Sequence, residues 1–514
     1  MYMESRNIYL YWVGKEYKLI SILRNLIYLH STSGKEYKVN LLTEHNIKDY
    51  IKDIPAYFNK LLPAHQADFV RVHVICEYGG IWLDSDTLVL DSLDTLFDLI
   101  EINDGFFIKE NNSILWNGIF GSKPNTPLMN KWKIDMMYKL DNTQGKIEWS
   151  DIGGGMLQNI YITNESLYDK YKIFNGLDNL YPVDLNNCVK EFLDKPYDNY
   201  KSIIREYQPL VVLVNSVYKR LESMTEQEIL AGRMPLNYFI NKSLEKKGIS
   251  KNLMYTNQLI YNYGIRDYIS KSIIDHKCWE PNISGIFDRI LKNNKNKESV
   301  VIDIGCNLGY YSILSANNTG ISKIYGIDAN IDNIYMLKMS SAINNIKHIE
   351  SLQFCISEKS GYFFKPSNKE FAKKGGNIGG MAYAKTTDNV NNDTSISTTI
   401  DEVVKMKSIT DIIIMKIDIE GGELNALKGA SDTLKKNIIK HIIIEITPKF
   451  NNDSIEILQI LKNNNYNLYN IPHVETGQYN NMDILSNICK NPIKDIEQFV
   501  KGVAIQTNIL AINN

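Results

Sequence analysis

Two aspartates, Asp84 and Asp86, lie two positions apart in the segment GGIWLDSDTL, directly after a Gly-Gly pair and a short apolar run. On an extended strand, side chains at positions i and i+2 point to the same side. Carboxylates placed in this way suit a hard divalent cation, and such an ion neutralises a diphosphate as it leaves. An Asp-x-Asp triplet also arises by chance as a solvated acidic turn, so the neighbouring residues must decide between the two interpretations.

The residues before this pair form an ordered pattern. The segment HQADFVRVHVICEYGG predicts a helix that places Asp68 and Arg71 on one face and ends at Gly79 and Gly80 in a turn of positive φ. Residues 81–83 then form a short strand that carries the carboxylates to its C-terminal end. In open α/β sheets, ligands bind at that end of the strands.

A second set of chemically active residues lies in VVIDIGCNLGYYS, residues 300–312. A dinucleotide fingerprint needs glycines at 305, 307 and 310, and the residues at 307 and 310 break it. The pattern Asp-x-Gly-x-Asn-x-Gly instead suits S-adenosylmethionine. Gly305, Asn307 and Gly309 let the backbone approach the methionine part, and Asp303 is expected to face its ammonium group.

Acidic residues at two further strand ends extend this set. Asp328 ends the next predicted strand, where it is placed to accept both ribose hydroxyls. The segment DIIIMKIDIEGGE carries Lys416, Asp418 and Glu420 at its strand end. Methyl transfer from a sulfonium depends mainly on alignment, but deprotonation of a hydroxyl benefits from a base. The sequence leaves open whether Asp418 or Glu420 is that base, or whether both only orient the acceptor or Lys416.

Strands and helices alternate in both halves of the chain, which predicts parallel α/β layers. The predicted strands and helices of the first half are 7–13, 17–30, 37–42 and 65–80, and the predicted strands of the second half begin near 300, 323, 411 and 441. His441 and Glu445 lie on the last of these strands and are expected to be polar groups of the core. The polar stretch 241–252 lacks a sustained apolar period and is predicted to be a linker. The expected domains are therefore 1–245 and 246–514, the second with a cofactor-binding core at about 298–450.

Composition excludes several classes of protein. A length of 514 residues predicts more than one domain, and 57 basic against 59 acidic residues give no global attraction to nucleic acid or anionic membranes. No apolar run is long enough for a membrane span, and charges interrupt the N-terminus, so neither a signal peptide nor a transmembrane segment is expected. The six scattered cysteines lack C-x-x-C spacing, which predicts reduced thiols and a cytoplasmic location.

The string ADFVRVHVICEYGGIWLDSDTLVL resembles the core signature of glycosyltransferase family 32 and of the related capsular-polysaccharide and clostridial-toxin transferases. The resemblance covers about the first 240 residues. It implies an N-terminal GT-A-type fold that transfers a sugar, with retention of configuration, from a UDP- or GDP-sugar with the help of Mn²⁺ or Mg²⁺. By the same resemblance, Asp68 and Arg71 hold the donor sugar, Asp84 belongs to the ribose and metal shell, and Asp86 binds the metal directly.

Other segments extend this resemblance. Trp12 and Gly14 in YWVGK lie where these enzymes keep an aromatic side chain that stacks on the nucleotide base, although a tryptophan here is also compatible with a buried core residue. The segment SDIGGGMLQN resembles the glycine-containing loop on the acceptor side. In LVVLVNSVYKRLE, Asn215 and Ser216 are the candidates for late metal and diphosphate contacts, and Asn215 stands where many relatives carry histidine.

The string STTIDEVVKMKSITDIIIMKIDIEGGELNALKGASDTL closely resembles the FkbM family of methyltransferases. The hallmark residues of that family correspond here to Lys416, Asp418, Glu420 and Gly421. The segment HKCWEPNISGIF resembles the part that precedes the glycine turn, with Trp279 and Glu280 at a helix start. The resemblance implies a Rossmann-like class I fold dependent on S-adenosylmethionine, in a family that mostly methylates oxygen, often on sugars.

Together the two halves predict a bifunctional enzyme that adds a sugar to a glycan or glycoconjugate acceptor and O-methylates a sugar hydroxyl. A nucleotide-sugar hydrolase, or a glycan-binding module fused to a methyltransferase, is the alternative. The complete set Asp68, Arg71, Asp84 and Asp86 favours an enzyme over a binding module. The donor, the linkage, the methylated atom and the oligomeric state are not predicted.

Overall fold

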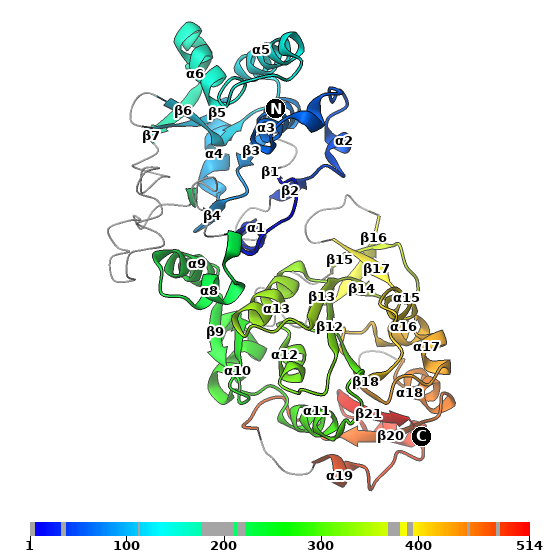
Figure 1. The fold of residues 1–514 in the computed structure, drawn as a ribbon. Helices are drawn as coiled ribbons and strands as arrows, with labels where there is room; N and C mark the ends of the chain where they lie inside the picture. Colours follow the sequence, from blue (N-terminus) through cyan, green and yellow to red (C-terminus); the bar gives the residue numbers. More distant parts are fainter. Residues whose placement is uncertain are drawn as a thin grey trace. The chain divides into compact units, whose positions relative to one another are not determined.

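The computed structural model describes residues 6–31, 37–110, 114–175, 210–212, 222–367, 381–387, 394–449, 453–479 and 484–513. The chain divides into two compact units, residues 1–247 and 248–514, which are considered separately below. Figure 1 gives the labels of the helices and strands.

The first unit is built on a six-stranded sheet with the order β2-β1-β3-β6-β5-β7. Its strands are β1 (Asn7–Tyr11), β2 (Lys38–Leu42), β3 (Gly80–Leu83), β5 (Gly105–Glu110), β6 (Ile114–Ser122) and β7 (Tyr171–Asn175). The strands β1, β2 and β3 are parallel, as the sequence predicts, whereas β6 runs antiparallel to both β3 and β5. Because β5 and β6 are only a few residues apart, they pair as a hairpin, and the sheet is mixed rather than parallel.

Helix α3 (Pro63–Tyr78) is central to this unit, and most of its residues are buried. The helix ends at Gly79 with φ of 65°, and Gly80 follows with φ of 116°, which confirms the predicted glycine turn. A Cβ atom on Gly80 would lie 2.4 Å from the carbonyl oxygen of Asn7, so only glycine allows β3 to begin this close to β1. The other long helices of the unit are α1 (Lys18–Ser31), α4 (Asp94–Ile102), α5 (Pro127–Thr143), α6 (Gly154–Thr163) and α9 (Pro235–Lys246).

The boundary between the two units falls after residue 247, inside the predicted linker 241–252, but this segment is not irregular as a linker would be. Its first half is the end of α9, and its second half includes β9 (Ser250–Leu253), which pairs with β10 (Leu259–Asn262). Leu236, Ile240 and Leu244 are spaced four residues apart and are buried on one face of α9. This apolar stripe begins before position 241, so a window that starts there misses it.

The second unit contains a seven-stranded sheet with the order β13-β12-β11-β18-β19-β21-β20. Its strands are β11 (Val300–Ile304), β12 (Lys323–Asp328), β13 (Ile349–Gln353), β18 (Ile412–Ile417), β19 (His441–Ile446), β20 (Tyr466–Ile471) and β21 (Thr507–Asn513). In this sheet, β13, β12, β11, β18 and β19 run parallel to one another. Strand β21 runs antiparallel to both of its neighbours, β19 and β20. The strands predicted near 300, 323, 411 and 441 are confirmed as β11, β12, β18 and β19, and their nearly continuous burial is typical of a sheet covered on both faces.

Two further parts of this unit bear on the site. Helix α11 (Pro281–Asn293) begins directly after Glu280, which confirms the predicted helix start, and α12 (Tyr310–Ala316) and α13 (Ile331–Ile343) follow β11 and β12. A small sheet of order β14-β17-β15-β16, in which β14 is Cys355–Ile356 and β17 is Ser395–Thr398, comes from the chain between β13 and β18. Its members β15 (Phe363–Pro366) and β16 (Tyr383–Thr386) are antiparallel.

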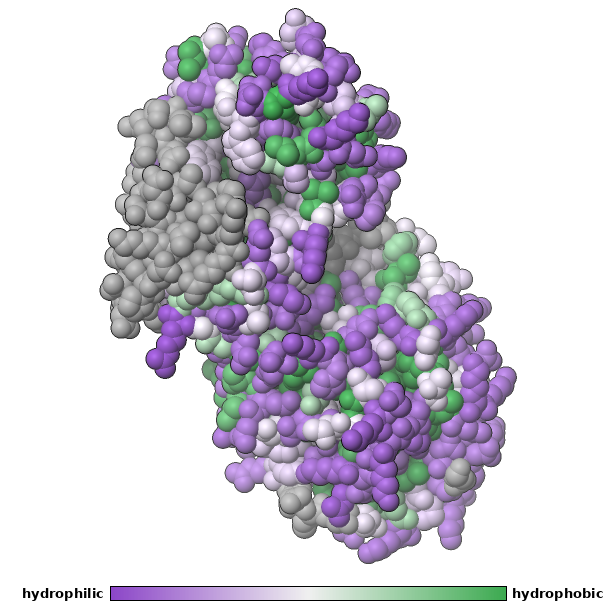
Figure 2. Space-filling model, viewed as in Figure 1, coloured by the Kyte–Doolittle hydropathy of each residue, from purple (hydrophilic) through white to green (hydrophobic). Residues whose placement is uncertain are grey.

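The molecular face in Figure 2 is mostly hydrophilic, with scattered small hydrophobic patches. Within the parts of the chain that the structure describes, no helix combines the length and the apolar character needed to cross a membrane.

Candidate active sites

The carboxyl end of β3 carries a buried ionic network in the first unit. Arg71 on α3 contacts Asp68 at 3.4 Å (Nε to Oδ1) and Asp84 at 3.3 Å (Nη2 to Oδ1). The indole of Trp82 donates to Asp84 Oδ1 at 2.8 Å, and the guanidinium of Arg71 lies 5.0 Å from the Trp82 ring centre. Arg71 therefore joins both predicted donor-binding aspartates, and its charge opposes the effect of burial on them.

Burial raises the pKa of Asp68 to about 6, although Arg71 and the amide of Asn117 favour its charged form. Asn117 lies on β6, donates to Asp68 Oδ1 at 2.7 Å and accepts a hydrogen bond from Arg71 at 2.5 Å through its backbone oxygen. Asn117 could not be identified from the sequence, because only the antiparallel pairing of β6 with β3 brings it beside Asp68. Burial also raises the pKa of Asp84.

The glycine-rich segment before α6 packs directly against this network. A Cβ atom on Gly153 would lie 2.5 Å from Asp68 Oδ2 and 2.7 Å from Asn117 Nδ2, so no larger residue fits while Asp68 keeps its place. The indole of Trp132 donates to the carbonyl of Ile152 at 3.0 Å and fixes the segment. The segment that resembles the acceptor-side loop thus borders the predicted donor site.

The Asp-x-Asp pair does not lie on an extended strand as the sequence predicts. Asp84 directly follows β3, and the amide of Thr87 donates to the carbonyl of Asp84 at 3.0 Å, so residues 84–87 form a turn. Asp86 lies in this turn, close enough to Tyr17 that its charge, after burial, raises the pKa of the Tyr17 hydroxyl. Extended geometry therefore does not explain the spacing of the two carboxylates.

The remaining candidates of the first unit are only partly described. Trp12 is partly buried, follows β1 and packs edge to face against Tyr17, with 5.5 Å between ring centres, and Gly14 has φ of 85°. Asn215 and Ser216 lie outside the described residues. Among the residues that the structure does describe, no group of three or more His, Cys, Asp or Glu side chains could hold a metal ion. Asp84 and Asp86 are hard oxygen donors, and the third predicted ligand, Asn215, cannot be placed beside them.

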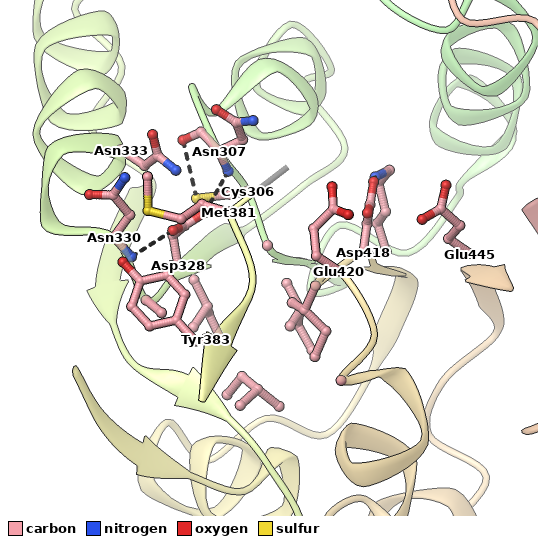
Figure 3. A pocket seen from close by; sticks show the side chains of 18 of the residues that line it. Cys306, Asn307, Asp328, Asn330, Asn333, Met381, Tyr383, Asp418, Glu420 and Glu445 are labelled. Atoms are coloured by element: carbon pink, nitrogen blue, oxygen red, sulfur yellow. Dashed lines mark hydrogen bonds and ion pairs between the residues drawn. The ribbon is translucent and has the colours of Figure 1, made fainter. Parts of the chain in front are cut away.

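The second unit has a cavity of about 400 Å³ at the carboxyl ends of its central strands. The cavity is lined by the turns after β11, β12 and β18, by the small sheet, and by the segments near 279 and 473. Figure 3 shows two groups of side chains across it: Asp328, Asn330, Asn333 and Tyr383 on one side, and Asp418, Glu420 and Glu445 on the other.

The glycine turn after β11 forms part of the cavity wall. A Cβ atom on Gly305 would lie 1.7 Å from the carbonyl oxygen of Asp418, so glycine is required where β11 and β18 end side by side. Gly309 has φ of 83° and begins α12, and Asn307 also has positive φ, at 49°. The buried Oδ1 of Asn307 has no hydrogen-bond partner among the residues that the structure describes, so the turn offers an acceptor to a ligand.

Asp328 lies at the end of β12 and lines the cavity. Its two carboxylate oxygens accept from the backbone amides of Asn307 at 2.8 Å and Asn330 at 2.7 Å, and both bonds are drawn in Figure 3. Burial raises the pKa of Asp328 to about 6, against the effect of these amides. The carboxylate is thus held rigidly and keeps further lone pairs for two hydroxyl groups.

Among the predicted cofactor residues, Gly309 does not line the cavity, and neither does Asp303. Its side chain is 1% exposed, and Oδ2 accepts from the Ser312 hydroxyl on α12 at 2.7 Å. Burial raises the pKa of Asp303, while the charge of Lys416 opposes that rise. Glu280, which the sequence marked only as a helix start, does line the cavity.

Lys416 is the buried cation of this site, at 3% exposure. Its Nζ lies 2.6 Å from Asp418 Oδ2 and 4.9 Å from the ring centre of Tyr311. Burial favours the neutral amine, but the charges of Asp418, Glu280 and Asp303 outweigh it and raise the pKa of Lys416. Lys416 thus balances carboxylates from β11, β18 and the start of α11.

On Glu420 and Glu445, burial and neighbouring carboxylates outweigh the charge of Lys416. Glu420 has φ of 55° and follows β18, and burial together with Asp418 raises its pKa to about 8. Burial with Asp418 and Glu420 raises the pKa of Glu445 to about 10. Both shifts favour the protonated form. Glu445 lines the cavity rather than being only a polar group of the core, whereas His441 bonds to the carbonyl of Ile413 at 2.8 Å.

The cavity residues that were not found from the sequence include Tyr383, His473 and Glu475. Tyr383 comes from β16, and His473 and Glu475 come from the irregular segment after β20. None of these segments carries a motif, and only the fold brings them to the strand ends. The spacing His-x-Glu was the one signal that could have marked the last pair.

The strand order of the second unit and the position of its cavity define a doubly wound α/β domain that binds its ligand at the carboxyl ends of the central strands. Residues 303–468 match the family model of the methyltransferase FkbM domain, and residues 2–204 match that of the capsular polysaccharide synthesis protein. The chain therefore has one region that is similar to capsular polysaccharide synthesis proteins and one that is similar to FkbM methyltransferase domains, which confirms the predicted arrangement of two fused transferase domains.

Other comparisons give weaker similarity. An uncharacterized protein of Arabidopsis thaliana is 32% identical over 69 residues, which is 12% of this chain and 11% of that protein. The solved structure of the PaToxG glycosyltransferase has a TM-score of 0.23 at 14% identity, covering 32% of this chain and 73% of that chain. An S-adenosylmethionine-dependent methyltransferase from Agrobacterium tumefaciens has a TM-score of 0.28 at 8% identity, covering 52% and 70%. The assignment of the two domains rests on the family models.

Proposed function

We propose that the chain is a bifunctional enzyme. Its first unit transfers a sugar from a UDP- or GDP-sugar to a glycan or glycoconjugate, and its second unit O-methylates a sugar hydroxyl with S-adenosylmethionine. The observation that carries the proposal is that each unit gathers buried acidic residues at the carboxyl ends of its parallel strands, around Arg71 in one and Lys416 in the other.

In the first unit, Asp68 and Arg71 bind hydroxyls of the donor sugar. Asp84 has one oxygen held by Arg71 and Trp82, and its side chain is 33% exposed, so its second oxygen is available to a ligand. Asp86, with Asp84 and Asn215, would hold Mn²⁺ or Mg²⁺, which neutralises the departing diphosphate when bound. Arg71 adds a fixed positive charge at the same strand end, and Trp12 stacks on the base.

In the second unit, Gly305, Asn307 and Gly309 border the methionine part of S-adenosylmethionine, and Asp328 accepts the two ribose hydroxyls. S-adenosylmethionine supplies a methyl group on a sulfonium. Lys416 and Asp418 fix the strand end beside the acceptor. Trp279 lines the cavity and packs edge to face on Tyr268, with 5.8 Å between ring centres, and such an aromatic wall suits the apolar face of a sugar.

Mass spectrometry tests both activities at once. The chain is incubated with UDP- and GDP-sugars, Mn²⁺, S-adenosylmethionine and a panel of glycan acceptors, and masses corresponding to an added sugar or methyl group are sought. We expect Asp86→Ala to abolish sugar transfer and leave the affinity for S-adenosylhomocysteine unchanged, and Asp328→Ala to do the reverse. Loss of both activities in either folded variant would contradict two independent sites, and release of nucleotide diphosphate without any glycosylated product would favour a hydrolase.

A further inference from the structure

The cavity of the second unit contains a histidine-carboxylate pair that neither family resemblance assigned. His473 Nε2 lies 2.9 Å from Glu475 Oε1, and both side chains line the cavity. They are 32% and 33% exposed, so the imidazole is open to an incoming molecule. A histidine in this setting has the access that a proton acceptor needs.

The segment that carries the pair is fixed to the rest of the domain. The amide of Glu280 donates to the carbonyl of Glu475 at 2.9 Å, and the side chain of Asn282 donates to the carbonyl of Pro472 at 2.8 Å. These bonds attach the segment to the start of α11. The side-chain amide of Gln506 also reaches Glu475 Oε1, at 3.4 Å. Glu475 is thus held in place before it orients the imidazole.

The pairing defines the tautomer. An ionised carboxylate only accepts hydrogen bonds, so Nε2 of His473 carries the hydrogen and donates it to Glu475. Nδ1 then keeps its lone pair. Imidazole is the side chain that changes charge near neutral pH without large perturbation, which makes it an effective general base.

The other titratable groups of the cavity are less suited to this task at neutral pH. They are Tyr268, Glu280, Cys306, Tyr310, Tyr311, Asp328, Cys355, Tyr383, Lys416, Asp418, Glu420 and Glu445. Burial raises the pKa of Cys306, Tyr310, Tyr311 and Cys355, and the Asp328 carboxylate accepts from the amides of Asn307 and Asn330. Asp418 is paired with Lys416, while burial, together with neighbouring carboxylates, raises the pKa of Glu420 to about 8 and that of Glu445 to about 10. Glu280 accepts from the Tyr311 hydroxyl at 2.8 Å, and burial raises its pKa. These shifts favour the protonated form of Glu420 and Glu445, which cannot take up a further proton as a base must.

We propose that His473 is the general base of the methyl transfer and that Glu475 positions it. The inference rests on the proposed O-methyltransferase function of this unit. The acceptor oxygen forms a bond to the methyl carbon, the carbon–sulfur bond breaks with its electron pair going to sulfur, and the hydroxyl proton passes to Nδ1 of His473. The resulting imidazolium returns the proton to water.

The experiment compares wild type with His473→Gln, Glu475→Gln and Glu420→Gln in the full chain. His276→Gln is the matched control, because His276 is a histidine of the same unit that does not line the cavity. Methylation of the p-nitrophenyl glycosides of glucose, galactose, mannose and N-acetylglucosamine is followed from pH 5 to 9, and affinity for S-adenosylhomocysteine is measured by calorimetry.

We expect His473→Gln to lower the rate about 10²- to 10⁴-fold and to remove the dependence of the rate on pH between 5 and 8, while affinity for S-adenosylhomocysteine stays within about twofold. Glu475→Gln should lower the rate less and keep that dependence, and His276→Gln should match wild type. A His473→Gln variant that keeps its rate, or a pH dependence lost in Glu420→Gln instead, overturns the proposal and makes Glu420 the base.

A second measurement needs no acceptor. In ¹⁵N-histidine spectra of the complex with S-adenosylhomocysteine, we expect the Nε2–H tautomer of His473 at pH 8 and its loss in Glu475→Gln. The Nδ1–H tautomer in wild type would overturn the proposal. If wild type binds S-adenosylhomocysteine but methylates none of the glycosides, the proposed acceptor class fails, and the tautomer still decides the role of the pair.

Discussion

Gly153 leaves the space that the carboxylate of Asp68 occupies, and the variant Gly153→Ala removes that space. The new Cβ atom would lie 2.5 Å from Asp68 Oδ2, about 0.9 Å closer than the 3.4 Å at which ordinary van der Waals contact begins. Asp68 cannot turn away freely, because Asn117 and Arg71 hold its other oxygen at 2.7 Å and 3.4 Å. Either the segment before α6 or the carboxylate must therefore shift.

The size of the effect follows from this overlap. Overpacking of a filled interior costs about 1–3 kcal/mol of unfolding free energy, which a folded domain of this size tolerates. A displacement of about 1 Å in a group that positions the substrate lowers the rate by about 10²-fold. We therefore expect Gly153→Ala to fold and to lose about 99% of its nucleotide-sugar turnover.

The assay measures release of nucleotide diphosphate from UDP- and GDP-sugars with Mn²⁺. Gly154→Ala is the matched control, because its Cβ atom would meet its nearest neighbour, the carbonyl oxygen of Leu115, only at 3.5 Å. The affinity for S-adenosylhomocysteine should be unchanged in both variants. Equal turnover in the two alanine variants would refute the reasoning that Gly153 matters through Asp68.

Three further predictions concern the second unit. Because burial raises the pKa of Asp328 to about 6, its carboxylate loses its charge as the pH falls through 6. In wild type, the affinity for S-adenosylhomocysteine, measured by calorimetry, should therefore fall from pH 7 to pH 5. In Asp328→Asn, the affinity should be weak and independent of pH. Tyr383→Ala should weaken S-adenosylhomocysteine binding by about fivefold, since an aromatic wall is worth about 1 kcal/mol. Tyr362→Ala should bind normally, because Tyr362 directly precedes β15 and does not line the cavity. Lys416→Met leaves buried carboxylates without their cation. The variant should lower the unfolding free energy by about 3–5 kcal/mol in urea titrations. A loss below about 1 kcal/mol would contradict the role of Lys416 as the cation that balances these carboxylates.

The strands and glycine turns of both units followed from the sequence because their signals are local. Apolar runs marked β11, β12 and β18, and Gly79 and Gly305 stand where positive φ or close approach of another strand excludes a side chain. The reversed direction of β6 did not follow, because strand direction depends on connections and pairing rather than on composition. The turn at Asp84 was also missed, because the Thr87 amide closes it through a single backbone hydrogen bond.

The candidate site was predictable only where a motif and a strand end coincide. Asp328 and Asp418 belong to that class, and both line the cavity. Asp303 carries a motif as well, but its side chain bonds to Ser312 on α12, and sequence spacing does not tell on which side of the turn a side chain lies. His473 and Tyr383 reach the cavity from segments without periodic pattern, so their role depends on long-range packing that no local signal encodes.

The charges around the cavity favour a cationic ligand. Lys416 is a single cation beside the carboxyl groups of Asp418, Glu280 and Asp303, whose charges raise its pKa. A positive charge placed nearby favours the ionised form of such carboxyl groups and gains an attraction that a neutral ligand does not. The sulfonium of S-adenosylmethionine carries such a charge, and the S-adenosylhomocysteine left after methyl transfer has lost it. The same carboxyl groups therefore attract the methyl donor more strongly than the product, which favours release of the product after each turnover.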